Sequence, residues 1–227
     1  MTIPKWQSAV LGLVFASRVY ASACAPGTLQ SYISLGSGGC TINGETVDNF
    51  NFSAIVGPLT ALTINVTPSF GAGFYQLYFW SGGFSVSLSA TAQYEIDFTW
   101  DPVVVGAGDQ MDARSPTFPG TATVTTSLCA GSAFGGATCP SPTFTPTNTL
   151  TVFNDGVNAD AITNAVTSFA QVSVVGTKSL ITLDANGQTS EITGFYTSVF
   201  TPEPSAFGLA ATGLLALALL RSPRRSG

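Results

Sequence analysis

Histidine is absent from this chain of 227 residues, and charged residues make up only 8% of it. The missing histidine removes the commonest general base, the commonest metal ligand and the usual pH-sensitive switch. It also excludes a Ser-His-Asp or Cys-His catalytic site. Any catalysis would therefore have to use carboxylates alone, and we expect neither a metal site nor an organic cofactor.

Positive charge is scarce in the middle of the chain. Arg114 and Lys178 are the only cations there, against eleven acidic residues between Glu45 and Glu191. The net charge of this middle part is therefore about −9. A body with so few cations cannot replace the counterions of a phosphate backbone, so nucleic acid is excluded as a partner.

The residue pattern of the body is that of strands. Thr, Val, Phe and Tyr are common while helix-favouring Glu and Lys are scarce, a balance that favours sheet over helix. From Phe84 to Trp100 every second residue is apolar or aromatic. Period two indicates half-buried strand, either one long bent strand or two strands joined near Ala90. Asn186-Gly187 predicts a β-hairpin, since both residues tolerate positive φ.

Further short strands are expected along the body, separated by Gly, Pro and Asn turns. They occupy residues 59–66, 75–80, 122–128, 150–153, 169–175, 179–183 and 191–200, with a short helical or irregular crossing over 158–168. This spacing is typical of all-β domains. We therefore predict an antiparallel β-sandwich, of jelly-roll or immunoglobulin-like type, over residues 24–200. An N-terminal signal helix and a C-terminal transmembrane helix are expected to flank it.

The N-terminus has the three parts of a secretory signal peptide. Lys5 gives a positive start, Ala9–Ala16 is a short apolar core, and Ala21-Ser22-Ala23 is a small-residue cleavage pattern. The pattern predicts a signal peptide over residues 1–23, export through the Sec machinery and a mature chain that begins at Cys24. Two alternatives stay open: a buried N-terminal helix, and a lipid attached to Cys24, for which Ala21 stands where a large aliphatic residue is preferred.

The C-terminus combines a proline motif, an apolar segment and a basic end. These are Pro202, Glu203 and Pro204, then the fifteen uncharged residues 206–220, then Arg221, Arg224 and Arg225. A helix of that length rises about 22 Å, less than the roughly 30 Å of the bilayer core. It is a marginal transmembrane helix that flanking arginines help by snorkelling. The arginines are expected on the cytoplasmic side of the inner membrane, which places the body outside.

This tail, residues 201–227, resembles the PEP-CTERM sorting domain of exported proteins in Gram-negative bacteria. The resemblance covers about a tenth of the chain. It implies that Pro202, Glu203 and Pro204 are recognised by an exosortase, a membrane-embedded cysteine transpeptidase. Cleavage near the motif would pass the protein from the inner membrane to the cell surface or extracellular matrix. A plain membrane anchor with an accidental Pro-Glu-Pro is the alternative.

The four cysteines form two local pairs in the sequence. An even number of cysteines in an exported chain suggests disulfides, and four allow three connectivities. We predict Cys24–Cys40 and Cys129–Cys139, because each closes a Gly-rich loop inside one region. A loop of about 15 residues contributes roughly 3 kcal/mol. Free thiols are the alternative.

Two acidic segments carry oxygen ligands that calcium prefers. Residues 155–160 and 184–187 combine Asp, Asn and Gly, but neither has the spacing of an EF-hand loop. We interpret the second segment as a turn.

Two further groups of residues suit a carbohydrate. Glu95, Asp97 and Asp101 are carboxylates beside Trp100, a combination that can hydrolyse a glycoside; we interpret them as solvated residues of an outer sheet face. The aromatic-rich segment Phe74–Trp80 suits a sugar ring, a partner or a sheet core.

Two hypotheses of function follow. The first is an exported surface or matrix protein with a non-catalytic β body, which the missing histidine and the low charge favour. The second is a secreted protein that binds or cleaves carbohydrate, with an extracellular polysaccharide as partner. An enzyme of this kind needs two carboxyls about 5 to 10 Å apart in one cleft. We expect a protein without catalytic activity.

Overall fold

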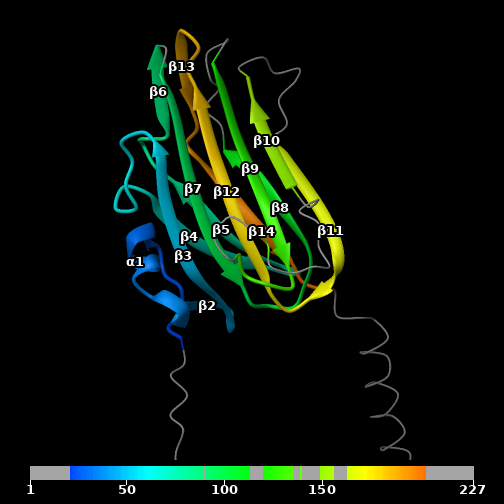
Figure 1. Cartoon of the computed structure of the whole chain (residues 1–227). Helices are drawn as coiled ribbons and strands as arrows, with labels where there is room; N and C mark the ends of the chain where they lie inside the picture. The colour runs from blue at the N-terminus through cyan, green and yellow to red at the C-terminus, as the bar shows by residue number, and fades with distance from the viewer. Residues whose placement is uncertain are drawn as a thin grey trace, which may run out of the picture.

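Two six-stranded antiparallel sheets make up most of the described chain (Figure 1). The computed structural model describes residues 21–88, 90–112, 120–134, 139, 149–155 and 163–202. The predicted all-β class and the β-sandwich are confirmed. The finer choice of a jelly-roll or immunoglobulin-like type stays a prediction.

Sheet A has the strand order β10-β9-β12-β7-β3-β2. Its strands are β2 (Cys40–Ile42), β3 (Glu45–Val56), β7 (Thr91–Trp100), β9 (Thr121–Ala130), β10 (Thr149–Asn154) and β12 (Val175–Asp184). In its centre β12 pairs along its whole length with both β7 and β9.

Sheet B has the strand order β1-β4-β5-β14-β8-β11. Its strands are β1 (Gly27–Thr28), β4 (Asn65–Gly71), β5 (Phe74–Trp80), β8 (Val104–Asp112), β11 (Asn164–Val172) and β14 (Gly194–Phe200). A two-stranded sheet pairs β6 (Ser85–Leu88) with β13 (Gln188–Glu191). The helical elements are α1 (Leu29–Ile33) and the 3-10 turn η1 (Gly36–Gly38).

Aromatic side chains fill the space between the sheets. Successive strand residues point to opposite faces, so the apolar half of each alternating pattern is buried. Phe98 of β7 contacts Phe79 of β5 across the core at 5.6 Å between ring centroids, and Phe79 stacks on Phe195 of β14 at 5.2 Å. Phe98 also contacts Trp100, which is 1% exposed. This aromatic group joins the two sheets.

The predicted strand over 84–100 is two strands, the second of the two alternatives. β6 ends at Leu88 and β7 begins at Thr91. Leu88 has a φ of 60°, a left-handed conformation that no extended strand continues through. β6 pairs with β13 outside sheet A, and the chain enters sheet A only with β7.

The prediction of strand over 59–66 is wrong for most of its length. Residues Thr60–Thr63 form a turn, in which the Thr63 hydroxyl donates to the Thr60 carbonyl at 2.8 Å, and β4 begins only at Asn65. Leu59 and Ile64 are nevertheless buried. Apolar residues that fill the core from a turn therefore imitate a strand pattern.

The expected crossing over 158–168 is also wrong in its second half. Residues Asn164–Ser168 belong to strand β11, whereas residues 156–162 lie outside the described part. The strands β3 and β8 were not expected at all. Glycines inside β8 weaken its strand pattern in the sequence.

The turn at Asn186-Gly187 is confirmed, but the hairpin is not. Asn186 and Gly187 have φ values of 43° and 87°, as a two-residue hairpin turn requires. The strands on either side diverge, however, since β12 pairs with β7 and β9 while β13 pairs with β6. The turn therefore connects β12 of sheet A with β13 of the two-stranded sheet.

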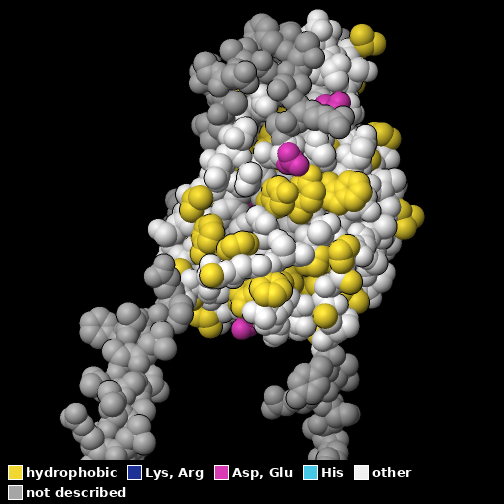
Figure 2. All heavy atoms as spheres, turned by 180° about the vertical axis from the view of Figure 1, so that it is seen from behind, with side chains coloured by type: hydrophobic (Ala, Val, Ile, Leu, Met, Phe, Trp, Pro, Cys, Tyr) yellow, Lys and Arg dark blue, Asp and Glu magenta, His cyan; other side chains and the backbone are white. Residues whose placement is uncertain are grey.

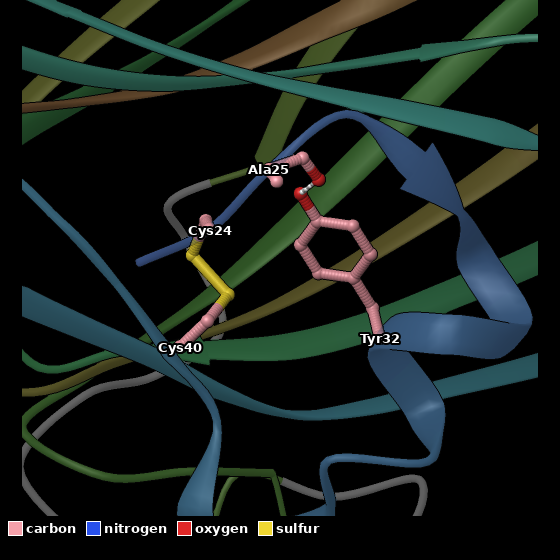
Figure 3. Close-up of a disulfide and its surroundings, with 4 residues drawn as sticks. All are labelled: Cys24, Ala25, Tyr32 and Cys40. Atoms are coloured by element: carbon pink, nitrogen blue, oxygen red, sulfur yellow. Dashed lines mark hydrogen bonds between the residues drawn. A yellow bond between two sulfur atoms is a disulfide. The ribbon is translucent and has the colours of Figure 1, made fainter. Parts of the chain in front are cut away.

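Both predicted disulfides are present. Cys24 is bonded to Cys40 and Cys129 to Cys139, and the described residues include no free cysteine. The first disulfide ties the N-terminal segment to β2 beside α1 (Figure 3). There the buried Tyr32 donates its hydroxyl hydrogen to the carbonyl of Ala25 at 2.7 Å. Disulfides are typical of oxidising compartments outside the cytoplasm.

The two predicted targeting segments fall mostly on residues that the structure does not describe. Residues 1–20 of the signal peptide, and the tail from Glu203 on with the transmembrane helix 206–220, lie outside the described residues. In the part that is described, no helix combines the length and apolarity that a membrane crossing requires.

The carboxyl group of Asp109 lies inside the sandwich. Asp109 of β8 is 1% exposed, and burial raises the pKa of its carboxyl to about 7, an effect that the hydroxyls of Thr126 and Thr197 partly offset. Thr126 in turn shares a hydrogen bond of 2.8 Å with Ser179, so polar groups from both sheets gather here. The neutral form of Asp109 is the form that this site favours.

Asp109 is expected to make the protein less stable as the pH rises from 6 to 8. Its pKa is about 7 in the folded state and about 3.9 in the unfolded state, so only the folded state keeps the proton near pH 6. The stabilisation is complete below the unfolded pKa and is lost through pH 7. The free energy of unfolding should fall by about 1 kcal/mol over this window.

Urea unfolding at pH 6 and pH 8 measures this fall. Asp48 and Asp97, with pKa values raised to about 6 mainly by burial, act mostly below the window. Asp109→Asn should reduce the fall to the smaller part that Asp48 and Asp97 contribute near pH 6, whereas Asp112→Asn, at an exposed position of the same strand, should retain the full fall. An unchanged fall in Asp109→Asn would assign the titration to another group.

Candidate ligand-binding face

The outer face of sheet B carries aromatic and amide side chains in a regular order. In β5, Leu77 and Phe79 are buried in the core, while Trp80 is 40% exposed. The segment Phe74–Trp80 therefore supplies both a core and an outer surface, and its two sequence interpretations each hold for alternate residues. Figure 2 shows hydrophobic side chains gathered on the back of the molecule, with few acidic groups among them.

The strand register arranges these side chains in rows that cross the sheet. One row places Tyr78 beside Tyr196, and another places Phe74 beside Phe200. Between these two rows lies a third, which contains only small or polar residues: Ser69, Gln76, Ser198 and Gly108 of β4, β5, β14 and β8. We call this arrangement the trough: a polar floor between a tyrosine ridge and a phenylalanine ridge.

Hydrogen bonds hold the floor of the trough in place. The Ser69 hydroxyl donates to Oε1 of Gln76 at 3.1 Å, and Nε2 of Gln76 donates to the hydroxyl of Ser198 at 3.0 Å. The Gln76 amide is thus fixed by a neighbour on each side. A ligand that binds there meets an ordered surface.

The tyrosine ridge is also fixed. The rings of Tyr78 and Tyr196 stack with centroids 4.2 Å apart, and the Tyr78 hydroxyl donates to Oδ2 of Asp112 at 2.9 Å. Burial, together with Asp112, raises the pKa of Tyr78. This hydroxyl is therefore neutral at any physiological pH.

Glycines in β8 make room for the Phe200 ring at the far end of the trough. A Cβ atom on Gly108 would lie 3.2 Å from Cζ of Phe200, and one on Gly106 would lie 2.6 Å from the carbonyl oxygen of Thr167. Their absence of side chains lets the Phe200 ring lie close to the strand. A cavity of about 220 Å³ in this part of the trough is lined by Phe74, Gln76, Gly108, Asp109, Gln110, Asn164, Val166, Ser198 and Phe200.

The predicted carboxylates lie on the opposite side of the molecule. Glu95 and Asp97 face outward from β7 in sheet A, and Nζ of Lys178 lies 3.2 Å from Glu95 Oε1 and 3.8 Å from Asp97 Oδ2. Burial raises the pKa of Asp97 to about 6, and Lys178 opposes that shift. The two neighbouring carboxylates thus share one cation.

A hollow of about 340 Å³ adjoins Asp97, with Asn51, Thr99 and Phe134 among its lining residues. Asp101 lies past the end of β7, where its backbone N–H donates to Thr46, and it is not among the residues of the hollow. The structure therefore brings Glu95 and Asp97 together but leaves Asp101 apart.

The described residues of the two acidic segments, 155–160 and 184–187, do not form a set of calcium ligands. Asp184 accepts a hydrogen bond from the backbone N–H of Asn186 at 3.0 Å, as part of the turn. Of the residues 155–160, only Asp155 lies in the described part. No group of three or more Asp, Glu or Cys side chains in the described residues is placed to hold a metal.

Sequence reasoning pointed to β5 but missed the other side of the trough. Tyr196, Ser198 and Phe200 alternate with buried residues within a predicted strand, which could have indicated a second outer row. The sequence did not indicate that Gly106 and Gly108 border this face, because their position there follows only from the pairing of β8 with β14.

Comparisons with known proteins leave the trough to be interpreted from its own residues. No protein-family model and no curated protein matches the chain. Among solved structures, the carbohydrate-binding module TmCBM61 in complex with beta-1,4-galactotriose is similar at 14% identity and a TM-score of 0.30. The match covers 65% of this chain and 86% of that chain. A TM-score this low supports no conclusion about fold type or ligand.

The two faces of β5 predict losses of stability of different size for substitutions at neighbouring residues. Phe79→Ala should lower the free energy of unfolding by about 3 to 5 kcal/mol, because the ring is buried between the sheets. Trp80→Ala should cost about 1 kcal/mol or less, because its side chain lies on the outer face. Urea unfolding of both variants tests this. Equal losses would mean that Trp80 belongs to the core.

Proposed function

We propose that this chain is an exported, non-catalytic surface protein, sorted by its PEP-CTERM tail, whose β body binds carbohydrate. The trough is the observation that carries the binding role. Export is supported by the two disulfides, which suit an oxidising compartment, and by the motif Pro202-Glu203-Pro204 with its apolar segment and arginines. The expected partners are the Sec machinery, an exosortase and the inner membrane during transit.

The positions of the polar, aromatic and acidic side chains favour binding without catalysis. The trough offers hydroxyls, amides and aromatic rings, the groups that recognise sugar hydroxyls and ring faces. Its floor and ridges consist of uncharged residues, while Asp109, which favours its neutral form, lines the cavity and Asp112 accepts from Tyr78. The carboxylate pair Glu95 and Asp97 lies on the other sheet and is ion-paired with Lys178.

The sorting proposal predicts a processed protein outside the inner membrane. In the producing cells, an internally tagged chain should begin at Cys24 and end near Pro202, as intact-mass measurement of the fractionated protein will show. Replacing Pro202 and Pro204 with Ala should leave the tail on and keep the protein in the inner membrane. The matched replacement Pro102→Ala, in the body, should be processed normally. A wild-type protein that retains Arg225 in the inner membrane would mean that the tail is only an anchor.

The binding proposal predicts that neutral polysaccharides retard the protein. In native affinity electrophoresis, gels that contain dextran, glucomannan or galactan should include at least one that slows the wild type. Tyr196→Ala and Phe200→Ala, which each remove a ring from one ridge, should reduce the retardation about tenfold in affinity. Val103→Ala, at an exposed apolar position outside the trough, serves as the control. No retardation in any gel would overturn the binding role while leaving the sorting proposal intact.

A further inference from the structure

The shape of the trough indicates how a ligand lies in it. Its floor runs across the strands from Ser69 of β4 to Gly108 of β8, and the cavity continues to Asn164 and Val166 of β11. Five strands at about 4.8 Å spacing give a length of about 19 Å. The two ridges stand on rows four residues apart along the strands, about 13 Å at 3.3 Å per residue. An extended molecule fits this shape better than a single sugar ring.

The charges around the trough indicate what kind of chain it takes. Among the described residues Lys178 is the single cation, and it lies on sheet A, paired with Glu95 and Asp97. At the tyrosine ridge the charged partner in the described residues is the carboxylate of Asp112, which accepts from Tyr78. The body as a whole carries about −9. Among the described residues, no cation lies at the trough to meet a uronate or sulfate group, and the negative body would repel such a group at longer range.

The two ends of the trough differ in chemistry. At the β4 end, the polar groups of Ser69 and Gln76 are bonded to each other. At the β8 and β11 end, Gln110 and Asn164 line the cavity with amide groups, and an amide carries two donors and one acceptor oxygen. The amide end is therefore the one that can read the hydroxyl pattern of a sugar, while the ridges hold its faces.

We propose that the ligand is an uncharged polysaccharide chain that lies across strands β4 to β11 in the trough, between the tyrosine and phenylalanine ridges. This inference rests on the proposed carbohydrate binding and goes beyond it in chain length, charge and direction. Each of these three properties has its own readout.

Chain length and charge are tested with the protein isolated from its producing cells. Isothermal titration with oligosaccharides cut from the neutral polymer that binds should show affinity rising at least tenfold from the monosaccharide to longer oligomers. Polygalacturonate should not retard the protein at any salt concentration. A monosaccharide that binds as tightly as the oligomers, or stronger retardation by polygalacturonate, would overturn the inference while leaving carbohydrate binding in place.

A charge added at the open end of the trough gives an independent check. Val166→Lys, at a position 64% exposed, should introduce salt-sensitive retardation by polygalacturonate. Thr151→Lys, on an exposed position of β10 in sheet A, should not. If both variants or neither gain this retardation, the chain does not pass β11.

Direction is tested with aromatic residues on the same face. Trp80 lies on the outer face of β5, one row beyond the tyrosine ridge, opposite Asn65 and Gly194. A chain that lies across the strands should lose about tenfold in affinity in Tyr196→Ala and in Phe200→Ala, and little in Trp80→Ala. A loss in Trp80→Ala as large as the losses in Tyr196→Ala and Phe200→Ala would instead mean that the chain runs along the strands β5 and β14. Absence of binding to every polymer in the wild type would overturn the proposed function itself.

Discussion

The contact between Phe79 and Phe98 is the interaction on which the other features of the sandwich depend. These rings, 5.6 Å apart, join β5 of sheet B to β7 of sheet A in the middle of the core. Because side chains alternate along a strand, burying Phe79 fixes Tyr78 and Trp80 on the outside of the same sheet. A shift of one residue in β5 would turn every one of these aromatic side chains to the other face. The core contact therefore determines that sheet B presents an aromatic outer surface.

The same register produces the trough. Antiparallel pairing sets Tyr78 beside Tyr196 and Gln76 beside Ser198, so that residues from distant parts of the sequence form continuous rows. The pairing of β8 with β14 then adds Gly108 to the floor. Such rows form only when three strands pair, so no local pattern in the sequence could predict them.

This explains which parts of the molecule were predictable. Local features were predicted correctly: the strand class from period two, the positive φ values at Asn186 and Gly187, and the pairing of cysteines that are close in sequence. The break near Ala90 was one of two alternatives that the sequence left open. Errors arose where tertiary contacts replaced local pattern. Leu59 and Ile64 fill the core from a turn, and the turn at Asn186 connects strands of two sheets instead of a hairpin.

Low charge and an ordered floor would both favour the binding of a neutral polymer to the trough. A surface with few charged groups gives up little hydration when a neutral polymer covers it, whereas exposed ion pairs would have to be desolvated. The polar groups that remain in the trough are already held, since Gln76 is bonded to Ser69 and Ser198 and the Tyr78 hydroxyl to Asp112. Side chains ordered in advance lose little conformational entropy on binding. The scarcity of charge is thus the property that suits this face to the long, uncharged chain proposed as its ligand.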